Sequence, residues 1–203
     1  MNNFEIKNIE SGRSMIEMLG VLAIIGVLSV GGIAGYSKAM TKYRINKTIE
    51  QITLIAGNIR TFFAPQRNYD GLSTMTADGI KIIQKAKLVP DEMWDGNQIK
   101  TVFGTPIYLN AGDISDGDKR AFVFLTGFDT VDGCIELLSQ DLTTMGVKVI
   151  MAGCSEDSGY YKAPLSVDDA IEACNKCEGL PDINLYFDTD LAGSSWSGVT
   201  WKN

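Results

Sequence analysis

The sequence predicts an α+β fold in which one long N-terminal helix packs on an antiparallel β-sheet. The stretch Met18–Ser37 carries no charge over twenty residues, and at the helical rise of ~1.5 Å per residue this gives ~30 Å, the thickness of a bilayer's hydrocarbon core. An apolar stripe with helical spacing follows it, and the rest of the chain contains short β-type runs. We therefore expect a membrane-spanning half-helix over 13–37 and one head domain over 38–203.

The helix is expected to continue without a break from about Arg13 to Phe63, because no proline occurs before Pro65. Its second half, about 38–63, is amphipathic and should pack on the head domain. The apolar positions recur at three- and four-residue steps: Ile45, Ile49, Ile52, Ile55 or Ala56, Ile59, and Phe62 or Phe63. Gly31 and Gly35 form a G-x-x-x-G pattern, which allows close packing of membrane helices, although glycine is also common in membrane helices generally.

The head domain is expected to combine short strands with a few helices. Residues 64–100 read as a loop with one short helix near Asp78–Leu88. A later helix over 130–142 has Asp129 or Thr130 as its N-cap, and another starts in the capping-box-like run Ser166–Asp169 and continues toward Cys177. With few helices between strands, the sheet should be antiparallel. The expected strands are Thr105–Leu109, Ala121–Thr126, Val147–Ala152 and Asn184–Phe187.

Composition argues against most enzyme classes. The chain has 203 residues, no histidine and a net charge of −7, so Ser–His and Cys–His catalysis and the commonest metal ligand are absent. No phosphate-binding glycine motif or nucleophile motif occurs. An acidic chain without a basic stripe is also a poor nucleic-acid binder. We therefore expect no catalytic residue, no metal site, no cofactor and no nucleic-acid partner, and we interpret the acidic pair Asp188 and Asp190 as a solvated turn.

The four cysteines all lie in the second half of the chain: Cys134, Cys154, Cys174 and Cys177. In an exported domain they predict two disulfides, whereas in the cytosol a C-x-x-C suggests zinc or redox chemistry. Because Cys174 and Cys177 fall near the end of their predicted helix, its dipole does not activate them. Four positive residues follow the apolar stretch, and the positive-inside rule alone would keep the head in the cytoplasm.

The N-terminal run Gly12-Arg-Ser-Met-Ile-Glu17, followed by an apolar helix, resembles the leader of type IV pilins and of type II secretion pseudopilins. The resemblance implies that 1–12 is a leader peptide and that a prepilin peptidase cuts between Gly12 and Arg13. It also implies methylation of the new N-terminal amine on Arg13, and it identifies Glu17 with the glutamate that the family has at the fifth mature position. Arg13 departs from the family pattern, which usually has an apolar residue there.

The type IVb class of these pilins is the most similar. About 190 residues follow the leader, a length typical of that class. A strand of the form A-F-x-x precedes a helix with the first cysteine, matched by AFVFLTGFDTVDGC ending at Cys134, and a cysteine turn precedes the last strand, matched by NKCEGLPDINLYF around Cys177. The resemblance implies the pilin fold, export of the head, and a Cys134–Cys177 bridge that leaves Cys154 with Cys174.

The expected function is that of a type IVb-like pilin, a structural subunit of an extracellular filament that is stored in the inner membrane with its head in the periplasm. Implied partners are other copies of the chain, prepilin peptidase, an assembly platform protein and an ATPase. Glu17 would pair with the terminal amine of a neighbour and set the register, in competition with Arg13 of its own subunit. The alternatives are a type II secretion pseudopilin, a minor pilin, or an unpolymerised single-pass membrane-anchored binding or redox protein.

Overall fold

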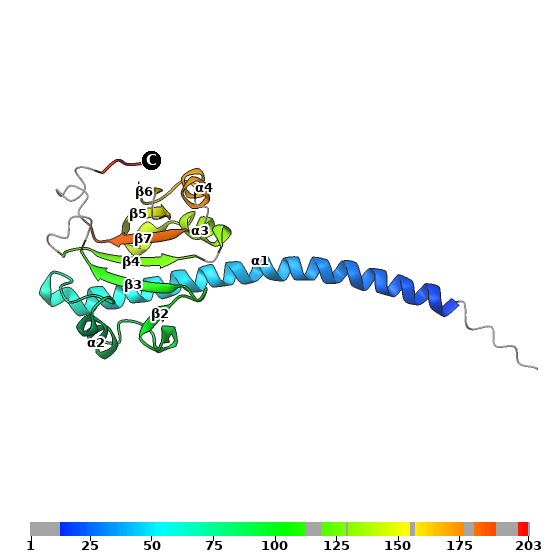
Figure 1. The fold of residues 1–203 in the computed structure, drawn as a ribbon, viewed down its shortest axis with the longest axis horizontal. Helices are drawn as coiled ribbons and strands as arrows, with labels where there is room; N and C mark the ends of the chain where they lie inside the picture. The colour runs from blue at the N-terminus through cyan, green and yellow to red at the C-terminus, as the bar shows by residue number, and fades with distance from the viewer. Residues whose placement is uncertain are drawn as a thin grey trace, which may run out of the picture. The chain divides into compact units, whose positions relative to one another are not determined.

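A computed structural model describes residues 13–112, 119–128, 130–154, 157–176, 181–189 and 199–202. Helix α1 spans Arg13–Phe63 as one α-helix of 51 residues (Figure 1), and this confirms the expected length and the absence of a break. Contacts within the chain separate a unit that ends at Tyr43 from a unit that begins at Arg44. In the described residues, the first unit consists of α1 from Arg13 to Tyr43, and the second is the head, which includes the rest of α1.

The head contains one seven-stranded sheet in the order β1-β2-β3-β4-β7-β5-β6. All six neighbouring pairs are antiparallel, as the sequence predicts. Strand β7 lies between β4 and β5, so it joins two parts of the sheet that come earlier in the chain. The strands are β1 (Trp94–Asp95), β2 (Gln98–Lys100), β3 (Pro106–Ala111), β4 (Phe122–Gly127), β5 (Val147–Cys154), β6 (Asp157–Lys162) and β7 (Asp182–Phe187).

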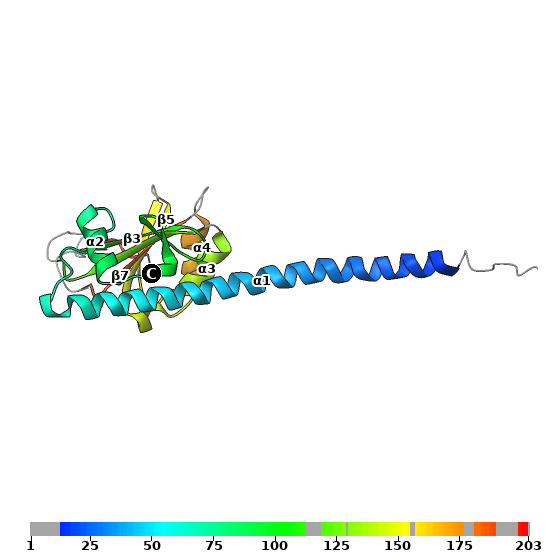
Figure 2. The same cartoon turned by 90° about the horizontal axis from the view of Figure 1, so that it is seen from below.

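The second half of α1 lies along one face of this sheet (Figure 2). Its large buried apolar side chains belong to the predicted stripe, and Ile45, Ile52, Ile55, Ile59 and Phe63 are at most 2% exposed. From the sheet, alternate residues of β4 and β7 point into the same core, because side chains two apart share a face. Burying each of these large apolar side chains contributes roughly 1.5–3 kcal/mol, and this attachment holds α1 to the head.

Three short helices complete the head: α2 (Ala77–Lys85), α3 (Val131–Leu138) and α4 (Val167–Asn175). Each begins at a hydroxyl residue whose side chain accepts a hydrogen bond from the backbone N–H three residues later. Such a cap satisfies one of the unpaired donors at a helix start. The N-caps are Thr76, Thr130 and Ser166, so the structure selects Thr130 for α3. Three 3₁₀ turns, η1 (Ala64–Gln66), η2 (Asp91–Met93) and η3 (Leu142–Met145), connect the elements.

The predicted loop over 64–100 is partly wrong, since it contains β1 and β2 as well as α2. These two strands form a tight hairpin whose turn uses Gly96 at φ 65°, a conformation that glycine adopts without a steric penalty. Strand β6 was also not predicted. Its sequence, DSGYYK, lacks the apolar alternation of a half-buried strand. In addition, α2 ends at Lys85, three residues before the predicted limit.

Candidate assembly surface and the contacts that anchor its helix

The first half of α1 presents a continuous apolar surface. Every large apolar side chain from Met15 to Val30 is at least 52% exposed. This is the one helix among the described residues that is long and apolar enough to cross a membrane, and its most apolar window has a mean hydropathy of 2.2 with none of it buried. An exposed apolar surface of this length is covered in nature either by lipid or by other helices.

The structure places the predicted assembly residues along this surface. Gly12 lies outside the described residues, and Arg13 is the first residue of α1. Glu17 is exposed on the same helix, one turn after Arg13. A Cβ added to Gly31 or Gly35 would meet nothing within 4 Å, so both positions leave room for a neighbouring helix. The roles of these residues in cleavage, methylation, register and helix packing stay predictions.

The disulfide pairing predicted from the family resemblance is wrong. Cys134 in α3 is bonded to Cys174 in α4, with Cα atoms 6.0 Å apart, instead of to Cys177. Because Cys174 is bonded to Cys134, the predicted bridge between Cys154 and Cys174 is excluded as well. Cys154 is also disulfide-bonded, which agrees with the predicted oxidised state, and Cys177 lies outside the described residues.

The packing of α3 on α4 explains the observed pair. Both cysteines are fully buried, and each lies on the helix face that carries the other buried residues of its helix. When two helices pack through such faces, inward-facing cysteines come within the Cα separation that a disulfide requires. The bridge closes a loop with a sequence separation of 40 residues, and a loop of this size stabilises the fold by about 3–4 kcal/mol.

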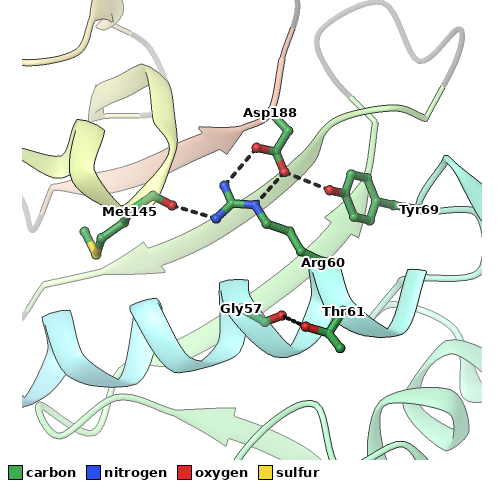
Figure 3. A network of polar contacts seen from close by, with 6 residues as sticks. All are labelled: Gly57, Arg60, Thr61, Tyr69, Met145 and Asp188. Atoms are coloured by element: carbon green, nitrogen blue, oxygen red, sulfur yellow. Dashed lines mark hydrogen bonds and ion pairs between the residues drawn. The ribbon is translucent and has the colours of Figure 1, made fainter. Parts of the chain in front are cut away.

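An ion pair that was not predicted anchors the end of α1 to the sheet (Figure 3). The Arg60 guanidinium donates from Nε and Nη2 to the two carboxylate oxygens of Asp188, each at 2.8 Å. Its Nη1 donates to the carbonyl oxygen of Met145 at 2.9 Å, and the hydroxyl of Tyr69 donates to Asp188 at 2.7 Å. This cluster, which we call the Arg60 anchor, joins α1, the segment after η1, η3 and the end of β7.

Two aromatic rings pack against the guanidinium of the Arg60 anchor. The guanidinium carbon lies 5.9 Å from the ring centre of Phe122 and 5.8 Å from that of Phe187. The two rings are themselves stacked with centroids 4.7 Å apart. A guanidinium over aromatic faces gains cation–π attraction in addition to its hydrogen bonds. The anchor is therefore held both by directed hydrogen bonds and by the apolar core beneath it.

Burial and the hydrogen bond to Asp188 raise the pKa of the Tyr69 hydroxyl well above its usual value, and the hydrogen bond to Asp188 raises the pKa of Arg60. Arg60 and Tyr69 therefore keep their protons at neutral pH, and the anchor is a structural contact. Asp188 belongs to the acidic pair interpreted as a solvated turn. For this residue the interpretation is wrong, because its carboxylate is only 30% exposed and is paired with Arg60.

In the described residues, no group of three or more histidine, cysteine, aspartate or glutamate side chains is arranged to hold a metal ion. The predicted site residues are thus divided between two places. The exposed helix carries Arg13, Glu17 and the two glycines, while the head carries the bridged cysteines, together with the Arg60 anchor that the sequence did not predict. The apolar and exposed surface, rather than a cavity with reactive groups, is the outstanding functional feature of the chain.

Comparisons with known proteins agree with this architecture. Two solved structures are similar in fold, and each is matched by 71% of this chain. One is a type IVb pilin from Salmonella typhi, with a TM-score of 0.52, 13% identity and 99% of its own length covered. The other is TcpA, a type IV pilin from Vibrio cholerae El Tor biotype, with a TM-score of 0.51, 11% identity and 98% of its length covered. Among curated protein sequences there is no significant match.

At these identities the structural similarity establishes the fold alone. Family membership comes from the sequence of the head, where the model of the bundlin family matches residues 37–184. This match covers more than half of the chain and includes the second half of α1, strands β1 to β6, the start of β7 and both bridged helices. The chain is a member of the bundlin family and has the type IVb pilin fold.

Proposed function

We propose that this protein is a structural subunit of a type IV pilus, anchored in the inner membrane by the first half of α1 before it enters the filament. One observation carries the proposal. A single helix presents an apolar surface, exposed by 52% or more at each large side chain from Met15 to Val30, and then continues into the core of a folded head. Lipid covers this surface in the stored subunit, and the same surface of neighbouring subunits covers it in the filament.

The proposed processing follows from the N-terminal sequence. Prepilin peptidase cuts between Gly12 and Arg13, the new amine on Arg13 is methylated, and Glu17 becomes the fifth residue of the mature chain. A carboxylate on an apolar helix is costly to desolvate unless it is paired. A neighbour in the correct register supplies that partner through its terminal amine, so Glu17 selects the register of assembly. The platform protein and the ATPase then move the subunit out of the membrane.

The test is expression of the full chain with a prepilin peptidase and a pilus assembly system. We expect N-terminal sequencing to show a mature chain that begins at Arg13, and electron microscopy to show filaments that contain it. A chain that keeps residues 1–12 would contradict the proposal and favour an unpolymerised membrane-anchored protein. If the chain is cleaved but does not form filaments by itself, the result would favour a pseudopilin or a minor pilin.

The role of Glu17 is tested by Glu17→Ala. We expect normal amounts of processed subunit in the membrane and at least a tenfold loss of sheared filaments, because the register contact is missing. Glu50→Ala is the matched control, since Glu50 is exposed on the same helix in the head and lies outside the apolar surface. Equal filament yields for the two variants would contradict the register role.

A further inference from the structure

The C-terminal residues Val199–Lys202 lie along the edge of the sheet, where Trp201 makes an isolated bridge. Strand β6 is the last strand on its side, and Trp201 pairs with Tyr160 of β6 in a parallel bridge. The backbone N–H of Lys202 donates to the carbonyl oxygen of Tyr160 at 3.1 Å. In Figure 1 the C-terminus accordingly lies beside β6. We call these residues the terminal strand.

Side chains attach the terminal strand to the outer face of the sheet. Val199 and Trp201 pack against a small cluster built on Val149 and Tyr186, which is separate from the main core. The ammonium of Lys162 lies 4.9 Å from the centre of the Trp201 ring. A sheet edge presents backbone groups that pair with any available strand. The terminal strand thus covers β6 and part of the outer face with few residues.

The direction of the terminal strand is unusual for this sheet. All six other strand pairs are antiparallel, whereas Trp201 runs parallel to β6. Parallel neighbours cannot be joined by a tight hairpin and need a long connection. No tight turn therefore holds the terminal strand to β6 of its own subunit. The length of the connection from β7 decides whether the terminal strand can reach β6 of its own subunit or β6 of a neighbouring subunit.

That connection is longer than the path requires. Trp201 pairs with Tyr160, Tyr160 pairs with Met151, and Met151 pairs with Asn184, so Trp201 lies three strand spacings from Asn184. Asn184 in turn comes four residues before Asp188 along the chain. With strands ~4.8 Å apart and a rise of ~3.3 Å per residue, this distance is roughly 20 Å. Thirteen residue steps separate Asp188 from Trp201, and a chain of that length reaches up to about 40 Å.

We propose that the terminal strand is exchanged between subunits, so that Val199–Lys202 of one copy pairs with β6 of a second copy in the filament. The contacts are the same in either arrangement, and this makes exchange of an end segment a low-cost route to association. In the membrane the subunits are dilute and the strand closes on its own β6. In the filament a second β6 is held nearby, and its effective concentration competes with that of the intramolecular site. The proposal rests on polymerisation of the subunit.

Two single-cysteine variants distinguish the arrangements. A Cβ placed on Gly159 would lie 3.0 Å from Cγ of Lys202, which is within reach of a disulfide between these positions. The described native cysteines are all bonded already. Cells that express both Gly159→Cys and Lys202→Cys subunits form a covalent dimer only when a terminal strand reaches another subunit. Ser158→Cys in place of Gly159→Cys is the matched control, because the two residues are adjacent in β6 and adjacent residues of a strand point to opposite sides.

We expect non-reducing gels of sheared filaments to show covalent dimers for the Gly159→Cys and Lys202→Cys mixture, at least fivefold more than in the membrane fraction, and none for the Ser158→Cys control. The double variant in one chain should give covalent multimers in filaments. Filaments with only monomers, in which the double variant closes within each chain, would overturn exchange and leave the pilus function intact. Absence of any filament would instead overturn the pilus function, and exchange with it.

Discussion

Arg60 is the only charged residue in the last turn of α1, and its side chain is committed to one carboxylate, one carbonyl and two aromatic rings. Charge-assisted bidentate pairs are stronger than neutral hydrogen bonds and fix orientation as well. The partner, Asp188, adopts a left-handed conformation with φ 57°. The turn after β7 therefore aims this carboxylate back at α1, which connects the end of the longest helix to the middle of the sheet.

Asp188→Asn tests this contact. Asparagine adopts the left-handed conformation as well as aspartate does, so the variant removes the charge without straining the backbone. We expect the free energy of unfolding of the head to fall by about 1–2 kcal/mol, a value reduced from that of a buried pair because each side chain is about one third exposed. Urea unfolding measures the change. Asp70→Asn is the control, since the Asp70 pair with Lys119 is exposed and its loss should leave stability unchanged.

Tyr69 makes the anchor sensitive to alkali. The pKa of its hydroxyl is raised by burial and by the hydrogen bond to Asp188, whereas in the unfolded chain it is about 10. The resulting stabilisation is fully present below pH ~10 and is lost as the pH rises toward the folded-state pKa, because the unfolded state releases its proton first. We expect wild type to lose more stability than Tyr69→Phe between pH 9 and pH 11 in thermal unfolding. Parallel pH profiles for the two proteins would contradict this role.

At the scale of elements, the sequence predicts best where a pattern is local. The continuous helix followed from an apolar stripe without proline, and the caps of α3 and α4 followed from Thr130 and Ser166. Strand β6 was missed because Asp157–Lys162 owes its strand pairing to β5 and has little apolar alternation. The disulfide depends on how α3 packs on α4, which no local signal encodes, and here the family resemblance suggested the wrong partner for Cys134.

The Arg60 anchor shows the same limit more clearly. Arg60 and Asp188 are 128 residues apart, and neither forms a motif with its sequence neighbours. One signal was available, since Arg60 directly follows the buried Ile59 and lies at the border of the apolar stripe. A charged residue at such a border is typically solvated, however, and only the turn after β7 reveals the partner. Sequence patterns thus located the helix surface but not the contact that fastens it.

The bridge between α3 and α4 allows a direct test at this scale. We expect the double variant Cys134→Ala/Cys174→Ala to be less stable by about 3–4 kcal/mol, mainly because its unfolded chain is no longer constrained. For a protein of this size the melting temperature should fall by roughly 10 °C. Differential scanning calorimetry measures the shift, and peptide mapping of the wild type should yield a Cys134–Cys174 linked pair. A Cys134–Cys177 pair in that map would contradict the structure.

At the scale of the whole molecule, the two halves of α1 require different surroundings. The apolar surface from Met15 to Val30 requires lipid or other helices, whereas the same helix from Ile45 to Phe63 is part of a folded core. The chain also carries a net charge of −7. The uncharged stretch Met18–Ser37 is therefore the part of the molecule in which a single added charge should have the largest effect on where the protein resides.

Val27→Lys places that charge near the middle of the uncharged stretch, at a side chain that is 75% exposed. A lysine at the centre of a membrane helix costs about 2.5–3.5 kcal/mol, so we expect a large decrease in the share of subunit that resists carbonate extraction from membranes. Asn46→Lys is the control, because Asn46 is exposed on the same helix beyond the apolar stretch. Equal extraction of both variants would contradict membrane anchoring by this segment.

The absence of a break in α1 also has a mechanical consequence. A helix loaded along its axis carries tension through its whole backbone, so force applied to the first half arrives undiminished in the turns beside the sheet. There, the buried isoleucine stripe and the Arg60 anchor resist sliding of the helix over the sheet together, rather than separating one after another. With the anchor placed in the last turn of α1, the helix should separate from the sheet in one step, and the head should behave under tension as a single rigid unit.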